Sequence, residues 1–166
     1  LKVDICEQLS KVFEIGIGEL RDELREKVSD MATETFRELI NEEGYSGLKI
    51  NEHYGLRMLD DKGRPAEEPS AGQSQIIAFS LIDSLSRIAR KGPIIVDTPL
   101  ARLDPHHRSS VLRHIPSMGT QVVLLVHEGE LPRTHPDLDV LKPNLSGVFD
   151  IKRINVNNSK IERGDL

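Results

Sequence analysis

The chain has 166 residues, enough for one well-packed domain with an appendage. With 22 Lys and Arg against 27 Asp and Glu its net charge is −5, which argues against this segment as the main contact surface for nucleic acid. Its single cysteine, Cys6, excludes an intramolecular disulfide and fits a reducing cytosol. We see neither a signal peptide nor an apolar run of transmembrane length, so we expect a cytoplasmic protein without a membrane partner.

A charged, helix-favouring segment covers residues 1–43, which we separate from a second unit at residues 44–166. Its imperfect apolar stripe consists of Leu20, Leu24, Val28, Met31, Leu39 and Ile40. Gly16 and Gly18 predict a kink or a break between two helices. The heptads are too few to establish a coiled coil, so an amphipathic surface helix fits equally well. Because the chain begins without Met inside this helix, we suspect an excised fragment.

Two short strands are predicted at residues 48–51 and 55–59, followed by a rigid polar approach at residues 65–69. A core-packed helix then runs to Lys91, since apolar residues recur at helical spacing from Ile77 onwards. Gly92 and Pro93 would end this helix.

The start of this helix is a candidate anion site. Ser70 is a good N-cap, and the small residues Ala71 and Gly72 would let a ligand approach the first turn. The free N–H groups of that turn suit a phosphate. An ordinary helix start explains the same residues about equally well.

Residues 94–96 form a continuous apolar run, which predicts an interior strand of a parallel sheet covered on both faces. Asp97 ends this strand, where ligands of open α/β sheets bind. Its carboxylate can hold Mg²⁺, directly or through water, beside nucleotide phosphates. A helix cap or a turn residue is the alternative role for Asp97.

A second strand, at residues 122–126, follows the helix predicted at residues 105–114, so a right-handed crossover would make the two strands parallel. Asp104 caps that helix and Pro105 occupies its first position. His127 follows the second strand, where its imidazole can donate a hydrogen bond to a phosphate or simply cap the strand. After a loop at residues 132–143, residues 148–156 and 160–163 predict a closing hairpin.

Four segments together resemble the ABC-type ATPases. Ser70-Ala-Gly-Gln-Ser-Gln resembles their signature motif, and Ile94-Ile-Val-Asp97 resembles their Walker B strand. Ala101-Arg-Leu-Asp104 resembles the D-loop, and His127 falls where the switch histidine follows the next strand. Each motif alone is weak, whereas the ordered set at family spacing is specific.

Within that class, the run from Asp97 to Asp104, followed by His107-Arg108, looks most like the DndD family. These are the SMC-like ATPases of bacterial DNA phosphorothioation systems. The match covers about residues 45–166. It implies an α/β fold, the carboxyl-terminal lobe of an ABC/SMC-type P-loop ATPase head, with helices flanking a mainly parallel sheet. Residues 1–43 would be the root of a coiled coil.

The resemblance also implies ATP and Mg²⁺ as cofactors and a homodimer that closes on ATP. Asp97 would hold Mg²⁺ and His127 would contact the γ-phosphate as the catalytic residues, while Arg102 and Asp104 would lie at the dimer interface. The γ-phosphate of a nucleotide held by the opposite subunit would be contacted by the signature residues Ser70, Ala71, Gly72 and Gln73. His106 and His107 do not suggest a metal site, because adjacent side chains on a helix point in different directions.

Two departures from the family pattern bear on activity. No G-x-x-x-x-G-K-[ST] loop occurs in the chain. The resemblance places that loop in an amino-terminal lobe of the same protein, so we expect this chain alone to be inactive. Many ABC ATPases carry a catalytic glutamate where this chain has Thr98, which cannot take a proton at neutral pH. Glu128 or Glu130 would have to substitute, or hydrolysis would be slow.

The expected function is therefore one half of an SMC-like ATPase that dimerises on ATP and acts on DNA together with other phosphorothioation proteins. The nearest alternative is an ATPase of DNA double-strand-break repair or another SMC-type ATPase. A third possibility is a clamp or scaffold that closes on ATP without hydrolysing it.

Overall fold

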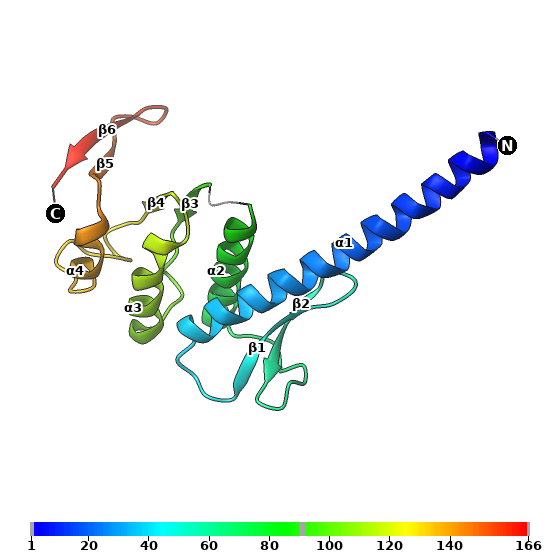
Figure 1. The fold of residues 1–166 in the computed structure, drawn as a ribbon. Coiled ribbons are helices and arrows are strands. Elements are labelled where there is room, and N and C mark those ends of the chain that lie inside the picture. Colours follow the sequence, from blue (N-terminus) through cyan, green and yellow to red (C-terminus); the bar gives the residue numbers. More distant parts are fainter. Residues whose placement is uncertain (1, 90–91, 166) are drawn as a thin grey trace.

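The computed structural model describes residues 2–89 and 92–165, and a long first helix projects from the body that the remaining elements form (Figure 1). This helix, α1 (Lys2–Leu39), is continuous. The break predicted at Gly16 and Gly18 is therefore wrong. A Cβ atom added to either glycine would have no other atom within 4 Å, so both lie on the open surface of the helix.

Only the carboxyl-terminal part of α1 contributes to the core. The predicted stripe is wrong at its beginning, since Leu20 is 54% exposed and Leu24 is also exposed. The residues that are buried recur at intervals of three and four: Val28, Ser29, Ala32, Thr35, Phe36, Leu39 and Ile40. This spacing places them on one face of the helix, which packs against α2 and β1.

Strands β1 (Tyr45–Ile50) and β2 (Leu56–Asp60) form an antiparallel hairpin beneath this buried face. Thr33 joins the helix to the hairpin, because its Oγ1 accepts from the Leu48 N–H at 2.9 Å and donates to the Leu48 carbonyl at 3.0 Å. Gly47 is required at the crossing: its φ is +153°, and a Cβ atom there would lie 2.4 Å from the Thr33 methyl carbon.

Helix α2 (Ala71–Ile88) begins with a capping box, as its sequence predicts. The Ser70 Oγ accepts from the Gln73 N–H at 3.2 Å, and the Gln73 Oε1 accepts from the Ser70 N–H at 2.9 Å. Ala89 is the C-cap. The predicted end at Lys91 lies outside the described residues.

Strands β3 (Pro93–Asp97) and β4 (Gln121–Leu125) pair in parallel, with α3 (Pro105–His114) and a 3₁₀ turn between them in the chain. One face of the pair packs on the core through Ile94, Val96, Val122 and Leu124. The other face is open, with Ile95 71% exposed and Val123 and Leu125 also exposed. The expectation that this sheet is covered on both faces is therefore wrong.

The chain ends with a short helix, α4 (Leu138–Leu141), and a hairpin of β5 (Val148–Arg153) and β6 (Ser159–Gly164). Within residues 2–89 and 92–165 the strands form three two-stranded sheets, and parallel pairing is confined to β3 and β4.

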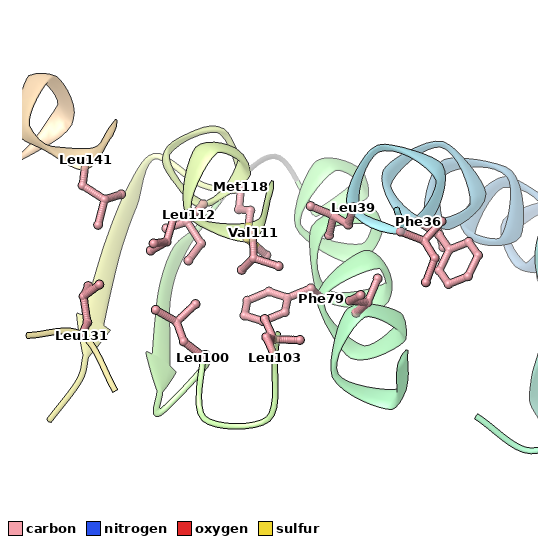
Figure 2. Packing of buried hydrophobic residues seen from close by; sticks show 14 of the residues in the cluster. Phe36, Leu39, Phe79, Leu100, Leu103, Val111, Leu112, Met118, Leu131 and Leu141 are labelled. Carbon is pink, nitrogen blue, oxygen red and sulfur yellow. The ribbon is translucent and has the colours of Figure 1, made fainter. Parts of the chain in front are cut away.

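A single apolar cluster joins α1, α2 and α3, and Figure 2 shows Leu39, Phe79 and Val111 from these helices side by side. Leu100, Leu131 and Leu141 extend the cluster toward the end of the chain (Figure 2). Across the described part of the chain, no helix is long and apolar enough to span a membrane.

Candidate functional site at the edge of the parallel sheet

Asp97 is the last residue of β3, and its carboxylate is exposed. The Thr98 hydroxyl donates to the Asp97 Oδ1 at 2.9 Å, and the Thr98 N–H donates to the Leu125 carbonyl at 2.9 Å. Thr98 has a φ of +51°, in the left-handed region that a β-branched residue rarely adopts. Such strain persists only where the surrounding structure enforces it, and it concentrates at functional sites.

His127 lies at the same edge of the sheet as Asp97. Asp97 is opposite Leu125 in the parallel register, and His127 follows Leu125 by two residues. The His127 side chain is exposed, and its carbonyl accepts from the Glu130 N–H at 2.9 Å and the Leu131 N–H at 3.1 Å. This turn leaves the imidazole facing solvent.

The two glutamates after His127 differ in position. Glu130 is only 2% exposed, and its Oε1 accepts a hydrogen bond from the Leu100 N–H. A general base must reach the proton of an attacking water, which this buried carboxylate does not. The suggestion that Glu130 could replace the missing catalytic glutamate is therefore wrong, whereas Glu128 is exposed.

The start of α2 packs against the turn that follows Asp97. A Cβ atom on Gly72 would lie 3.1 Å from the Arg102 carbonyl oxygen, so any larger residue would press on that backbone. The Gln75 Nε2 donates to the Pro99 carbonyl. Ser70, Ala71 and Arg102 are exposed. The signature-like segment and the D-loop-like turn therefore form one continuous surface.

Gln73 is occupied by protein contacts. Besides its part in the capping box, its Nε2 donates to the Glu42 Oε2 at 2.5 Å and to the Tyr45 Oη at 3.2 Å. These bonds tie α2 to Glu42, in the connection after α1, and to Tyr45, the first residue of β1. Its predicted contact with a nucleotide stays a prediction.

Asp104 caps α3 as its sequence predicts. Its Oδ1 accepts from the His106 N–H at 2.9 Å and the His107 N–H at 3.2 Å, and its Oδ2 accepts from the His107 Nδ1. Burial alone would raise the pKa of Asp104, but the hydrogen bonds from His107 and the two backbone N–H groups lower it below its usual value. The His107 Nε2 accepts from the Asn41 N–H at 3.3 Å, so this buried histidine has a structural role.

The sequence and the fold were compared with those of known proteins. No family model matches the chain. A DNA double-strand break repair Rad50 ATPase from Halobacterium salinarum is 28% identical over 144 residues, which cover 76% of this chain and 16% of that protein. This chain thus spans about a sixth of that relative's length.

Solved structures agree on the fold. A Smc head domain with a coiled coil and joint from Pyrococcus yayanosii superposes with a TM-score of 0.63 at 18% identity, covering 93% of this chain and 30% of that one. A structure from work on ATP-driven dimerization and DNA-stimulated activation of SMC ATPases has a TM-score of 0.61 at 18% identity, with 89% of each chain covered. The chain has the fold of the carboxyl-terminal lobe of an SMC ATPase head.

The sheet edge of this SMC-type lobe fits a magnesium ion in part. Mg²⁺ is usually held by one or two carboxylates, with water and phosphate oxygens as its other ligands. Asp97 offers one exposed carboxylate of this kind. Within the residues that the structure describes, no group of three or more His, Cys, Asp or Glu side chains is arranged to hold a metal. The remaining ligands would have to come from a nucleotide and water.

The SMC-type lobe also contains a buried charged cluster that sequence reasoning missed. Asp83 on α2 is 0% exposed and contacts Thr35 Oγ1 at 2.7 Å, Arg87 Nη2 at 2.8 Å and His114 Nε2 at 3.3 Å. His114 Nδ1 lies 3.3 Å from a Glu38 carboxylate oxygen. The signal was available, since Asp83 falls four residues after the core residue Phe79 on the buried face of its helix.

Burial of Asp83 alone would raise its pKa, but the close contact with His114, the hydrogen bond from Thr35 and the charge of Arg87 lower that pKa below its usual value. The cluster joins α1, α2 and α3, which contribute Thr35, Asp83 and His114 respectively. It therefore connects the projecting helix with both helices that border the candidate site.

Proposed function

We propose that this lobe belongs to an SMC-like ATPase that binds ATP with Mg²⁺ between two copies of its head. The observation that carries the proposal is the shared sheet edge, where Asp97 and His127 are exposed beside the strained Thr98. In such a site Mg²⁺ would neutralise charge on the phosphates. The Asp97 carboxylate would hold the ion directly or through water, and the His127 imidazole would donate a hydrogen bond to the γ-phosphate.

The signature-like segment would serve the nucleotide of the second copy. Its support is the exposed helix start at Ser70 and Ala71, where free N–H groups and the helix dipole favour an anion. Gly72 keeps this start in contact with the exposed Arg102 turn. Ser70, Arg102 and Asp104 would accordingly lie on the surface that faces the partner copy.

We also propose that an amino-terminal lobe of the same protein completes each head. The open face of the β3–β4 pair supports this, because Ile95, Val123 and Leu125 present adjacent aliphatic side chains that a soluble domain normally covers. That lobe would supply the phosphate-binding loop that this sequence lacks. This chain alone would then neither bind ATP tightly nor hydrolyse it.

The biological substrate would be DNA, and the finer proposal is phosphorothioation. The amino-acid sequence of residues 97–104 supports a DndD-like role with other phosphorothioation proteins. The relative named as a DNA double-strand break repair ATPase favours repair as a second candidate. Mass spectrometry of digested DNA from cells with wild-type protein or Asp97→Asn would separate them. Sulfur-containing linkages that disappear in the variant would support phosphorothioation, and their absence from both would contradict it.

Hydrolysis itself needs a separate test, because Thr98 occupies the position where many relatives of this fold class carry a base. The purified complete protein would be mixed with ATP in excess over nucleotide sites, and phosphate release compared with Asp97→Asn. Release above the variant's rate would establish an ATPase. Equal rates, with ATP-driven dimerisation intact in the wild type, would support the non-hydrolysing clamp instead.

A further inference from the structure

Glu130 is a buried carboxylate that the proposed chemistry does not use. It lies three residues after His127, and its backbone N–H closes the turn onto the His127 carbonyl at 2.9 Å. Its side chain is buried, whereas the His127 imidazole is exposed. The position of Glu130 is thus tied directly to the backbone of the histidine loop.

The buried carboxylate holds the turn after Asp97. The Glu130 Oε1 accepts from the Leu100 N–H, and Leu100 is fully buried. The Leu103 N–H donates to the Leu100 carbonyl at 3.2 Å, which fixes the intervening exposed residues Ala101 and Arg102. Leu100 and Leu131 belong to one apolar cluster (Figure 2).

Stability alone does not explain a glutamate here. The second oxygen, Oε2, is buried and accepts no hydrogen bond from any residue that the structure describes. A buried polar atom without a partner costs about 1–3 kcal/mol. An apolar core residue would avoid that cost but would leave the Leu100 N–H without its acceptor. The carboxylate therefore provides a connection that packing could not.

We propose that Glu130 is a positioning residue that couples the His127 loop to the Arg102 turn, and this inference rests on the proposed function. A phosphate oxyanion that binds His127 shifts the backbone of its loop. Glu130 transmits the shift through the Leu100 N–H to the turn that bears Arg102 and contacts Gly72. Contact of a nucleotide with His127 thereby changes the position of the Arg102 turn, which faces the second copy.

The test compares Glu130→Met, which keeps the length of the side chain but removes the acceptor, with Glu130→Gln, which keeps an acceptor oxygen without the charge. The same substitution at an exposed glutamate on α1, Glu23→Met, is the matched control. For the complete protein, the affinity for a non-hydrolysable ATP analogue is measured at protein concentrations too low for dimers. The analogue concentration that half-saturates dimerisation is then measured by light scattering.

Coupling between sites typically amounts to 5–150-fold, so Glu130→Met should raise the half-saturating concentration by about 5-fold or more. Monomer affinity and melting temperature should stay near wild type, Glu130→Gln should dimerise nearly normally, and Glu23→Met should not differ from wild type. Wild-type dimerisation by Glu130→Met would overturn the inference. Equal losses in both Glu130 variants, in step with melting temperature, would overturn it as well.

Hydrogen exchange in the wild-type protein provides a test that needs no variant. The Leu100 amide should change its protection when the analogue binds, before dimers form. Unchanged protection would overturn the inference even if Glu130→Met failed to fold. A wild-type protein that neither binds the analogue nor dimerises would overturn the proposed function too. Normal wild-type dimerisation with an unaffected Glu130→Met would overturn only the role of Glu130.

Discussion

Two charged regions of this lobe differ in their exposure to solvent. The Asp83 cluster between α1, α2 and α3 is buried, and Asp83 has three side-chain partners there. The Asp97–His127 edge is exposed, and the Asp97 carboxylate accepts a hydrogen bond from the neighbouring Thr98. All three partners of Asp83 contact its Oδ2, and removing one member of such a buried charged group is strongly destabilising, whereas the exposed Asp97 carboxylate is available to a ligand. Substitutions should therefore separate the two regions.

The largest effect is expected from Asp83→Ala. Removing one member of a buried charged group typically costs about 3–5 kcal/mol, because the remaining charges lose their partner. Arg87 is partly exposed and can regain water, so we expect a loss near the lower end, about 3 kcal/mol.

Thermal unfolding of the complete protein measures this loss. Asp139→Ala, which removes an exposed carboxylate 2.6 Å from Lys142, is the control and should change stability by no more than about 1 kcal/mol. Equal melting temperatures for Asp83→Ala and wild type would contradict a structural role for the cluster.

Asp97→Asn should lower ATP turnover and leave stability unchanged. An amide keeps the shape of the side chain but removes the charge that faces Mg²⁺, and loss of an outer metal partner typically costs about 10–100-fold. ATP turnover of the complete protein should fall by that factor while the melting temperature stays near wild type. A normally folded variant with unchanged turnover would remove Asp97 from the site.

Ser70→Arg tests whether the exposed helix start faces a second copy. Loss of the cap alone should cost about 1 kcal/mol, and Ser70→Ala, which loses the cap without adding bulk, is the matched control. We expect Ser70→Arg to abolish dimerisation driven by a non-hydrolysable ATP analogue, since the arginine would block closure. Light scattering would show this, and dimers of Ser70→Arg at wild-type levels would contradict the composite site.

The smallest effect concerns acid stability. The pKa of Asp83 is lowered in the folded state, so its stabilisation is present above the unfolded pKa of about 3.9 and is lost as the pH falls through the folded value. Thr35, Arg87 and His114 face this carboxylate, and Glu38 lies beyond His114. Melting between pH 6 and pH 3 should fall more steeply for wild type than for Asp83→Asn. Parallel curves would refute the linkage.

Sequence reasoning succeeded where the signals are local. The start of α3 follows from Asp104 and Pro105, and the start of α2 follows from Ser70, because caps act within one turn of the helix. These same local motifs indicated the SMC-type fold. The roles of the residues at the sheet edge stay predictions.

It failed where distant segments decide the outcome. An apolar run such as residues 94–96 does not reveal which face of the strand lacks a cover. Helical periodicity likewise could not show that α1 contributes to the core only after Leu24. The contact between Glu130 and Leu100 joins positions thirty residues apart and leaves no periodic trace. The buried role of Asp83 likewise depends on distant segments, because its partners Thr35 and His114 lie on α1 and α3.

The unbroken first helix has a mechanical consequence. Its 38 residues form a rod about 57 Å long at 1.5 Å per residue, and only the inner part is anchored. A sideways push at the far end would act as torque about the first anchored residues, near Ser29, whose Oγ accepts from the Ile50 N–H at 3.0 Å. The part of α1 after that point carries Thr35 and Glu38, so the torque would strain their contacts with Asp83 and His114.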